Sequence, residues 1–396
     1  MTAVQPISIA LLAGYYVSWM GGADILGFLL NAMSRAAPAQ NATIHLLMNA
    51  RQPPESLRRE VRDFLPLRRE QITAEGPLRW LLDSVASLEV VLFYKDLAAT
   101  LDALQVDVIG PTGENLGGDF ARPWFSYVPD FQHQYLAHFF SQRERMQCDL
   151  HFRALVENST DVFVNSATVA ADIRRFYPWA AKSRRIHRFA QVFPDVSAAM
   201  AGPGNAVLAR YGIERPYLLS CSQRWLHKQH ELILAAFAEF RSRNPATDLQ
   251  LLFTGERDDY RNPAYAQAVV SLVDKLGLAD HVRHLGLIAR ADQLQLIAGA
   301  EGVVQASLFE GGPGASGALE AALLGTPVIA SDIEANRELP FGRFQYFDAK
   351  SSSALADAIA ELVAEGPSPP FDREQIDFLA TASGVQTIAA LRSAVA

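Results

Sequence analysis

Residues 302–331 read "GVVQASLFEGGPGASGALEAALLGTPVIAS", and this stretch decides the fold class. It begins with an apolar run typical of a buried strand and continues through a glycine-rich turn. Apolar residues at helical spacing follow at 316–324, and a second strand-like run, "PVIAS", ends the stretch. A buried strand, a helix and another buried strand predict a parallel β–α–β unit. Gly325 directly follows the predicted helix, where glycine commonly caps a C-terminus.

The same alternation continues on both sides of this stretch. In the second half, strand-like runs lie at 217–222, 249–255 and 281–286, and helical patterns lie at 231–240, 264–276 and 292–299. In the first half, strand-like runs lie at 7–14, 42–49, 88–94, 106–110, 161–166 and 185–192, with helical patterns such as 23–34 and 96–104 between them. Continuous apolar strands separated by helices predict an α/β protein with parallel sheets covered on both faces.

Two lapses in this alternation predict domain boundaries. The segment "PDVSAAMAGPGN" at 194–205 holds two prolines and two glycines, and "EGPSPPFD" at 365–372 precedes a last helical pattern. We therefore expect a Rossmann-like domain at 1–198, a second at 199–370, and a C-terminal helix at 371–396 that returns to the first domain. Ligands of such sheets bind beyond the carboxyl ends of the strands, where the glycine-rich stretches of this chain fall.

Length and composition narrow the class further. At about 150 residues per domain, 396 residues predict two domains, or three. Hydrophobic residues make up 49% and charged residues 20%, so the chain can bury a large core. The net charge of −8 argues against a general nucleic-acid binder. Two cysteines, Cys148 and Cys221, provide no disulfide framework, and we expect a cytoplasmic protein.

The apolar N-terminus resembles a signal peptide or a membrane span at first sight. Residues 7–33 carry a single charge, Asp24, but no lysine or arginine precedes Arg35, so the basic region of a signal peptide is missing. Glycines interrupt the run. A buried strand, a glycine turn and a helix explain it better than export or membrane spanning.

The glycine turn admits more than one interpretation. Gly312 begins a G-x-G-x-x-G pattern that ends at Gly317, and Asp332 lies 20 residues after Gly312, where a dinucleotide-binding enzyme places its ribose-binding acid. However, the pattern comes late in its domain, and the Glu310 charge would oppose a pyrophosphate. A turn without a ligand is the second interpretation, but it does not explain the acids Glu310 and Glu320 on either side.

The third interpretation rests on a resemblance. Residues 307–339, "SLFEGGPGASGALEAALLGTPVIASDIEANREL", resemble the donor-site signature of the retaining glycosyltransferases with the GT-B fold, family 4 (glycosyl transferases group 1). The family signature has two glutamates within "S-x-x-E-G-F-G-L-P-x-x-E-A-M-A-x-G-x-P-V-V-A-S-D", and Glu310 and Glu320 match them. Nine residues separate the two acids here, against seven in the family, so two residues are inserted in the glycine turn.

The resemblance implies a role for each matching residue. Glu310 would bind hydroxyl groups of the donor sugar, and Glu320 the ribose of its nucleotide, because a carboxylate accepts hydrogen bonds from neighbouring hydroxyls. Backbone amides of residues 311–316 would hold the diphosphate at the start of a helix. This amide set includes Gly311, Gly312, Gly314 and Ser316.

Other stretches resemble the family more weakly. In "YLLSCSQRWLHKQHELILAAF", Lys228 falls on the lysine that neutralises the donor phosphates, and Arg224 lies one position after the family arginine and would replace it. The backbone near Ile288 would contact the nucleobase. The pair Gly21-Gly22 matches a glycine pair that faces the donor phosphate, although a simple turn explains it as well.

"YVPDFQHQYLAHFFSQRERMQ" resembles a stretch in a bacterial polysaccharide branch of the family. We expect His133 to contact the reacting sugar as a catalytic residue beside Glu310, with Asp130 orienting the loop; a core or surface histidine remains the alternative. His227 and His230 lie three residues apart, but no cysteine or HExxH pattern supports a metal site, and we expect no metal or other cofactor.

An arginine-rich stretch at 51–70, "RQPPESLRREVRDFLPLRRE", has two interpretations. The simpler is a solvated helix. The other is a face that meets anionic lipid head groups at the inner membrane or a lipid-linked pyrophosphate acceptor.

The sequence thus predicts a retaining glycosyltransferase that takes a GDP-mannose-like, UDP- or dTDP-sugar, needs no metal, and glycosylates a glycan or lipid-linked acceptor in polysaccharide assembly. Three alternatives stay open. They are an NAD(P)-dependent oxidoreductase that uses Asp332, a non-catalytic sugar-nucleotide-binding protein, and an epimerase on the same fold.

Overall fold

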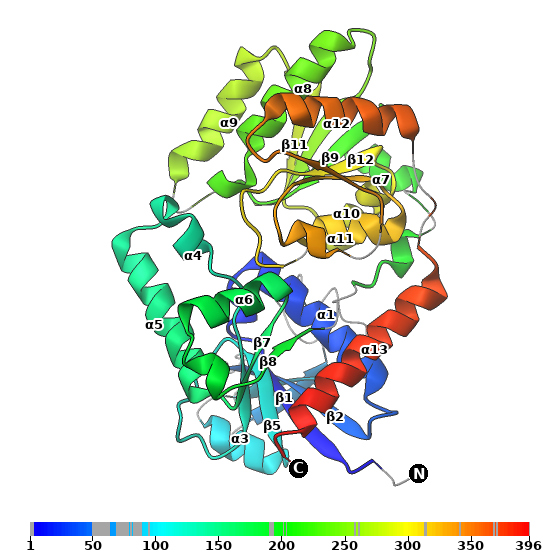
Figure 1. Cartoon of the computed structure of the whole chain (residues 1–396). Helices are drawn as coiled ribbons and strands as arrows, with labels where there is room; N and C mark the ends of the chain where they lie inside the picture. Colours follow the sequence, from blue (N-terminus) through cyan, green and yellow to red (C-terminus); the bar gives the residue numbers. More distant parts are fainter. Residues whose placement is uncertain are drawn as a thin grey trace. The chain divides into compact units, whose positions relative to one another are not determined.

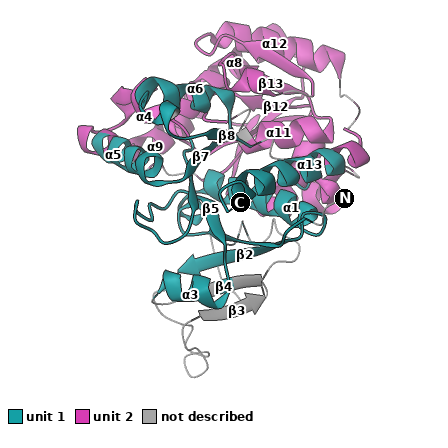
Figure 2. Cartoon of the chain, turned by 60° about the horizontal axis from the view of Figure 1, so that its bottom comes forward, with its two compact units in different colours: residues 1–129, 146–195, 377–396 teal, residues 130–145, 196–376 magenta. Residues whose placement is uncertain are grey.

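The chain forms two compact units in a computed structural model (Figures 1 and 2). The structure describes residues 4–49, 64–68, 79, 81, 89–93, 96–189, 194–200, 202, 204–256, 259, 262–312, 315–339, 342–366, 369 and 371–395. The first unit comprises residues 1–129, 146–195 and 377–396, and the second comprises 130–145 and 196–376. Gly314 and most of the arginine-rich stretch at 51–70 lie outside the described residues.

An eight-stranded sheet forms the framework of the first unit, in the order β3-β4-β2-β1-β5-β6-β7-β8. Its strands are β1 (Ile7–Leu12), β2 (Ala42–Asn49), β3 (Phe64–Arg68), β4 (Glu89–Phe93), β5 (Val108–Thr112), β6 (Trp124–Tyr127), β7 (Asp161–Val164) and β8 (Ile186–Arg188). All neighbours pair in parallel except β3, which runs antiparallel to β4 at the edge. The predicted parallel sheet is therefore confirmed, with one antiparallel edge strand added.

The helices described in this unit are α1 (Met20–Ala36), α3 (Leu97–Ala103), α6 (Ala167–Phe176), most of α5 (Gln142–Asn158) and most of α13 (Arg373–Arg392), with short 3₁₀ turns at Tyr16–Ser18 and Ala180–Lys182. The apolar N-terminal run forms β1 and α1, as predicted. Among the described residues, no helix is both long and apolar enough to cross a membrane.

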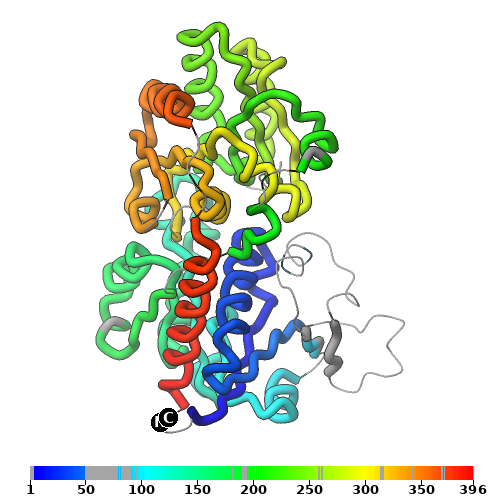
Figure 3. The backbone as a smooth tube through the Cα atoms, turned by 90° about the vertical axis from the view of Figure 1, so that its right-hand side faces the viewer, coloured from blue at the N-terminus to red at the C-terminus, as the bar shows by residue number. Residues whose placement is uncertain are grey.

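The last helix, α13, packs along α1 (Figure 3). Gly384 makes this approach possible, because a Cβ atom there would lie 2.0 Å from the carbonyl oxygen of Ala32. Arg392 donates to the carbonyl oxygens of Gln5 and Gln40, and Arg35 pairs with Asp377 at 2.6 Å. Residues 377–396 thus join the first unit, although they lie far from its other residues in the sequence.

A six-stranded parallel sheet forms the second unit, in the order β11-β10-β9-β12-β13-β14. Its strands are β9 (Tyr217–Cys221), β10 (Gln250–Thr254), β11 (Val282–Gly286), β12 (Gly302–Gln305), β13 (Val328–Ser331) and β14 (Phe344–Phe347). Its α-helices are α4 (Gln132–Tyr135), α7 (Asn205–Arg210), α8 (His230–Arg243), α9 (Pro263–Lys275), α10 (Arg290–Ala298), α11 (Ala315–Leu324) and α12 (Ser352–Glu365), and 3₁₀ turns lie at Ala137–Phe139, Ser197–Ala199, Leu226–Lys228 and Asn336–Glu338.

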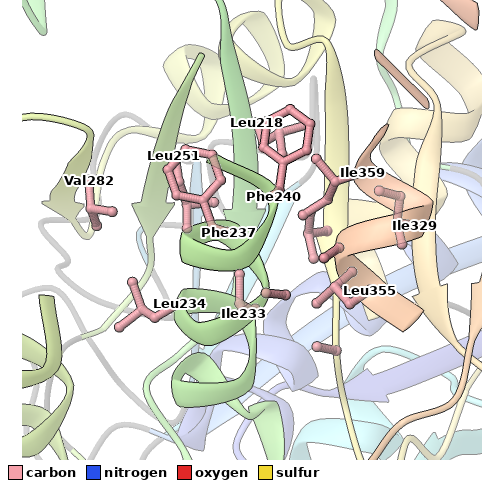
Figure 4. Packing of buried hydrophobic residues seen from close by; sticks show 14 of the residues in the cluster. Leu218, Ile233, Leu234, Phe237, Phe240, Leu251, Val282, Ile329, Leu355 and Ile359 are labelled. Carbon is pink, nitrogen blue, oxygen red and sulfur yellow. The ribbon is translucent and has the colours of Figure 1, made fainter. Parts of the chain in front are cut away.

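The core of the second unit lies between the sheet and the helices α8 and α12 (Figure 4). Phe237 and Phe240 of α8 pack with strand residues such as Leu218 and Leu251, all of them buried. Gly325 has a φ of +78°, which confirms the predicted glycine cap after α11. The stretch 302–331 is thus the β12–α11–β13 unit that the sequence predicts.

Candidate functional site

Lys228 and Glu310 form an ion pair at the carboxyl edge of the second sheet. Lys228 lies in the turn after β9, and Glu310 lies in the loop after the neighbouring parallel strand β12. The Lys228 Nζ and Glu310 Oε1 atoms are 2.5 Å apart, and the side chains are only 14% and 12% exposed. The Leu308 amide donates to the His227 carbonyl at 2.8 Å, which ties the two loops together. The structure therefore brings together two residues that the sequence singled out 82 positions apart.

Gln229 fixes the backbone on both sides of this pair. It lies in the left-handed region, with φ of +51°, and directly precedes α8 as its N-cap residue. Its Nε2 atom donates to the carbonyl oxygens of Ala306 and Ala349, each at 2.8 Å. The bond to Ala306, which directly follows β12, ties the backbone beside Lys228 to the segment that leads to Glu310.

Glu310 has a second partner, Gln305, the last residue of β12. Gln305 Nε2 donates to Glu310 Oε1 at 2.8 Å. Asn336 Nδ2 in turn donates to Gln305 Oε1 at 2.9 Å, and to the Ser331 carbonyl at 2.8 Å. All three residues beneath the acid are buried. Neither Gln305 nor Asn336 was singled out from the sequence, because one appeared as part of a strand and the other as part of a loop.

Asp130 and His133 belong to the second unit, although their position in the sequence placed them within the first predicted domain. The Asp130 carboxylate accepts a hydrogen bond from the Gln132 amide at 2.8 Å. Burial raises the pKa of Asp130, and the charge of Glu310 raises it further, whereas the Gln132 hydrogen bond and the charges of His133 and Lys228 lower it. The segment therefore lies within electrostatic range of the Lys228–Glu310 pair.

The same segment is anchored by aromatic contacts. His133 is only 3% exposed, and its ring stacks on Phe131 with 6.1 Å between the centroids. Tyr135 stacks on Phe309, the neighbour of Glu310, at 5.4 Å. These contacts hold residues 130–135 against the loop that carries the acid.

Arg224 is buried in the loop between β9 and Lys228, and its amide donates to the Glu256 carbonyl at 3.0 Å. Together with Lys228, it acts on His230, the first residue of α8. Burial and then the charges of Arg224, His284 and Lys228 lower the pKa of His230 to about 3. The charges of Arg224 and Lys228 thus both lie within electrostatic range of His230. From its spacing, His230 was considered only as a metal ligand, because the charges around it come from residues that the folded structure brings near.

Glu320 lies inside the unit. Its side chain is fully buried and pairs with Arg290, which is 6% exposed, at 2.5 Å. Burial raises the pKa of the neighbouring Cys221 thiol to about 12, and the charge of Glu320 adds to this effect. A ribose could contact Glu320 only in a conformation that exposes the carboxylate. Ile288, expected near the nucleobase, is also buried.

The glycine loop leads into α11, which begins at Ala315, one residue before the predicted helical run. Gly311 and Gly312 are half-buried, and Ser316 lies in the first turn of the helix. Gly317 packs against Cys221: a Cβ atom at Gly317 would lie 2.9 Å from the Cys221 Cβ, so this glycine is needed for packing. Backbone amides at the start of a helix attract anions.

Asp332, the ribose-binding acid of the oxidoreductase alternative, is already paired. Arg337 Nε and Nη2 donate to its two carboxylate oxygens at 2.6 and 2.8 Å. This bidentate bond lowers the pKa of Asp332. A ribose there would have to compete with the guanidinium group.

Gly21 and Gly22 lie in the first turn of α1 in the first unit. A Cβ atom at Gly21 would lie 2.5 Å from the Trp19 ring, and one at Gly22 would lie 2.4 Å from the Tyr16 carbonyl oxygen. Packing therefore accounts for both glycines. Among the described residues, no cluster of three or more His, Cys, Asp and Glu side chains could hold a metal ion.

Comparison with known proteins identifies a family model that matches part of the chain and solved structures with the same fold. Residues 215–365 match the family model "Glycosyl transferases group 1". No curated protein matches the chain. Among solved structures, a sucrose-phosphate synthase from Thermosynechococcus elongatus is 18% identical, with a TM-score of 0.63 over 98% of this chain and 95% of that one.

Two further structures match over nearly the whole chain. Anabaena Alr3699/HepE in complex with UDP is 17% identical, with a TM-score of 0.60 over 99% of this chain and 96% of that one. The catalytic domain of starch synthase IV from Arabidopsis thaliana, bound to ADP and acarbose, is 14% identical, with a TM-score of 0.59 over 98% and 99%. The chain therefore has the GT-B fold, carries a glycosyl transferases group 1 domain at residues 215–365, and is a glycosyltransferase.

Proposed function

We propose that the chain is a retaining glycosyltransferase of family 4 that moves a sugar from a nucleotide-diphosphate sugar to a glycan or lipid-linked acceptor in polysaccharide assembly, without a divalent metal. The observation that carries the proposal is the Lys228–Glu310 pair at the carboxyl edge of the second sheet. A cation and an acid held side by side suit a ligand that has a phosphate next to sugar hydroxyls.

In this proposal Lys228 binds the diphosphate, and Arg224 adds positive charge from the same loop. The start of α11 provides backbone amides to the same phosphates, from residues that include Gly311, Gly312 and Ser316. As the bond to the sugar breaks, negative charge develops on the leaving diphosphate. Fixed positive groups in a site of low polarity stabilise that charge without the reorganisation that water requires, which is the role that a metal ion has elsewhere.

Glu310 accepts hydrogen bonds from hydroxyls of the donor sugar, and His133 contacts the reacting sugar, with Asp130 orienting the segment between them. Charges near Asp130 support this arrangement, since both Glu310 and Lys228 act on its carboxyl. The sequence resemblance alone supports three parts of the proposal: retention of the anomeric configuration, the bacterial polysaccharide branch and the acceptor class. Among the similar solved structures are complexes with UDP and with UDP-glucose, which favour a uridine donor as the first to be tested.

The domain match favours transfer over the oxidoreductase alternative, because residues 215–365 include both Glu310 and the glycine loop. Isothermal titration with UDP-, GDP- and dTDP-sugars in EDTA tests the proposal. We expect one donor class to bind in EDTA. No binding of any donor, or binding that requires a divalent ion, would contradict it.

Glu310→Gln tests the role of the acid. The variant should fold and bind the free nucleoside diphosphate, but transfer should fall by about 100-fold or more, as when a group that acts in the transition state is lost. Turnover at the wild-type rate would remove Glu310 from the site.

Transfer should also leave the anomeric configuration of the sugar unchanged, as proton NMR of the product would show.

A further inference from the structure

Two polar side chains, Asn336 and Gln305, lie beneath the candidate acid and form a hydrogen-bonded chain that ends on it. Asn336 donates to Gln305 at 2.9 Å, and Gln305 donates to Glu310 at 2.8 Å. Asn336 is fully buried and Gln305 is nearly so, which excludes water as an alternative partner. These hydrogen bonds join three separate segments of the second unit: the end of β12, the loop after it, and the 3₁₀ turn after β13.

The directions of these hydrogen bonds are fixed by the Ser331 carbonyl at one end and by the Glu310 carboxylate at the other. The Ser331 carbonyl can only accept, so Asn336 must present its NH₂ group there, at 2.8 Å. The same NH₂ group meets Gln305, which must therefore present its oxygen to Asn336. Gln305 then has only its own NH₂ group to present to the carboxylate, which is the group an ionised acid accepts. Reversing either amide would set like groups against each other.

Gln305 and Lys228 hold the same oxygen of Glu310. Both bonds end on Oε1, at 2.8 and 2.5 Å. Among the hydrogen bonds recorded between described residues, Oε2 accepts none. One lobe of the carboxylate is thus anchored by the protein, and the other has its lone pairs available to a ligand.

The two anchors differ in what a phosphate does to them. A diphosphate attracts the Lys228 ammonium, which must then divide its hydrogen bonds between the ligand and Glu310. The Gln305 amide is neutral, so a phosphate exerts no comparable pull on it. When Lys228 turns toward the donor, Gln305 is the contact that keeps the acid in place.

We propose that Gln305, oriented by Asn336, is a positioning residue that holds Glu310 so that Oε2 faces the donor sugar. This inference rests on the proposed function. It assigns a role to a residue that does not itself touch the substrate. The structure supports it through bonding directions that agree from Ser331 to Glu310.

The first test needs no turnover. The full chain is labelled with ¹⁵N at glutamine side chains, and Gln305→Met, which keeps the length of the side chain, identifies the Gln305 amide signal. A hydrogen bond to a carboxylate shifts that amide proton downfield. In Glu310→Ala the signal should move upfield, whereas a signal unchanged by Glu310→Ala would overturn the inference.

The second test separates positioning from packing. Gln305→Met should lower kcat by about tenfold or more, which corresponds to about 1.4 kcal/mol, the range of a hydrogen bond to a charged group. The donor KM should change less than kcat. Gln345→Met is the matched control, because Gln345 lies on β14 of the same sheet and binds a different acid, Glu361. That variant should keep wild-type kcat.

A double-mutant cycle gives the deciding number. In a Glu310→Ala background, Gln305→Met should change the residual kcat less than twofold, against tenfold or more in the wild-type background, because the group that it positions is gone. An equal loss in both backgrounds would show a merely structural role and overturn the inference. Gln305→Leu replaces Gln305→Met if the latter does not fold.

Failure of the proposed function would give a different result. The wild-type chain would then bind no sugar nucleotide, while the NMR result would still decide whether Gln305 holds Glu310.

Discussion

At the residue scale, Asp130 shows how a site residue can oppose stability. Its buried carboxyl has a raised pKa, mainly because burial disfavours the charged form. At neutral pH the ionised Asp130 therefore destabilises the folded chain relative to an exposed aspartate. Groups of this kind persist where their charge serves a site, which fits the position of Asp130 within electrostatic range of Glu310 and Lys228.

We predict that Asp130→Asn stabilises the chain and impairs transfer. Asparagine keeps the shape and can still accept the Gln132 amide bond. Because the folded pKa is raised above the ordinary 3.8, the charge penalty is present at pH 7 and vanishes as the pH falls below 3.8. Urea unfolding at pH 7 should show a gain on the order of 1 kcal/mol. A variant that is less stable at pH 7 would show that the carboxylate is compensated in the folded state.

The lowered pKa of His230 predicts that the free energy of unfolding decreases in acid. Its folded pKa of about 3 lies below the ordinary 6.5, so the unfolded chain takes up a proton that the folded chain refuses. The contribution of the neutral His230 ring to the free energy of unfolding is fully present above pH 6.5. It is lost as the pH falls toward 3, by up to about 1.4 kcal/mol for each pH unit. His230→Gln should flatten the loss of unfolding free energy between pH 7 and 5, whereas His138→Gln, at an exposed histidine, should not.

At the element scale, the Arg290–Glu320 pair joins the start of α10 to α11. Both side chains are almost completely buried, so either charge alone would be left without compensation in the interior. Arg290→Met should lower the free energy of unfolding by about 3–5 kcal/mol. The double variant Arg290→Met/Glu320→Leu should recover most of that loss, because apolar groups can replace a buried pair. Urea unfolding of the three proteins measures both effects; a double variant as unstable as Arg290→Met would contradict them.

Most elements could be predicted from periodicity, because strands buried on both faces form continuous apolar runs. β3, β6 and β14 were missed. β14, "FQYF", is short and half-buried, and β6, "WFSY", is only four residues long, so neither gives a strong pattern. Residues 130–145 were assigned to the wrong side of the expected boundary, because their aromatic contact with Phe309 comes from a distant part of the chain.

The site was predictable only where residues follow strand ends. Lys228 and Glu310 do so on neighbouring parallel strands, and the structure brings them together. Gln305 and Asn336 lie 31 residues apart, and their bond depends on the packing of the 3₁₀ turn after β13. The partner of Glu320 was equally hidden, since Arg290 begins a helix and has no spacing relation to it.

At the scale of the whole molecule, each unit has its own hydrophobic core, so each can be followed separately. The first core includes Leu11, Leu30 and Phe125, and the second includes Phe237 and Ile359. Hydrogen exchange reports local opening within each unit. A ligand that binds one unit stabilises that unit by mass action, by about 2.7 kcal/mol at 100 times its dissociation constant.

We therefore predict that a nucleoside diphosphate, added with EDTA, slows hydrogen exchange chiefly in the second unit. Protection should centre on the turn at Leu226–Lys228 and the start of α11, where Lys228 and the loop amides would hold the phosphates. The start of α1 is the internal comparison: slowing there would add Gly21 and Gly22 to the phosphate site, whereas unchanged exchange would leave them with the packing role beneath Trp19. Protection confined to the first unit would place the nucleotide in the wrong half of the chain and contradict the donor site.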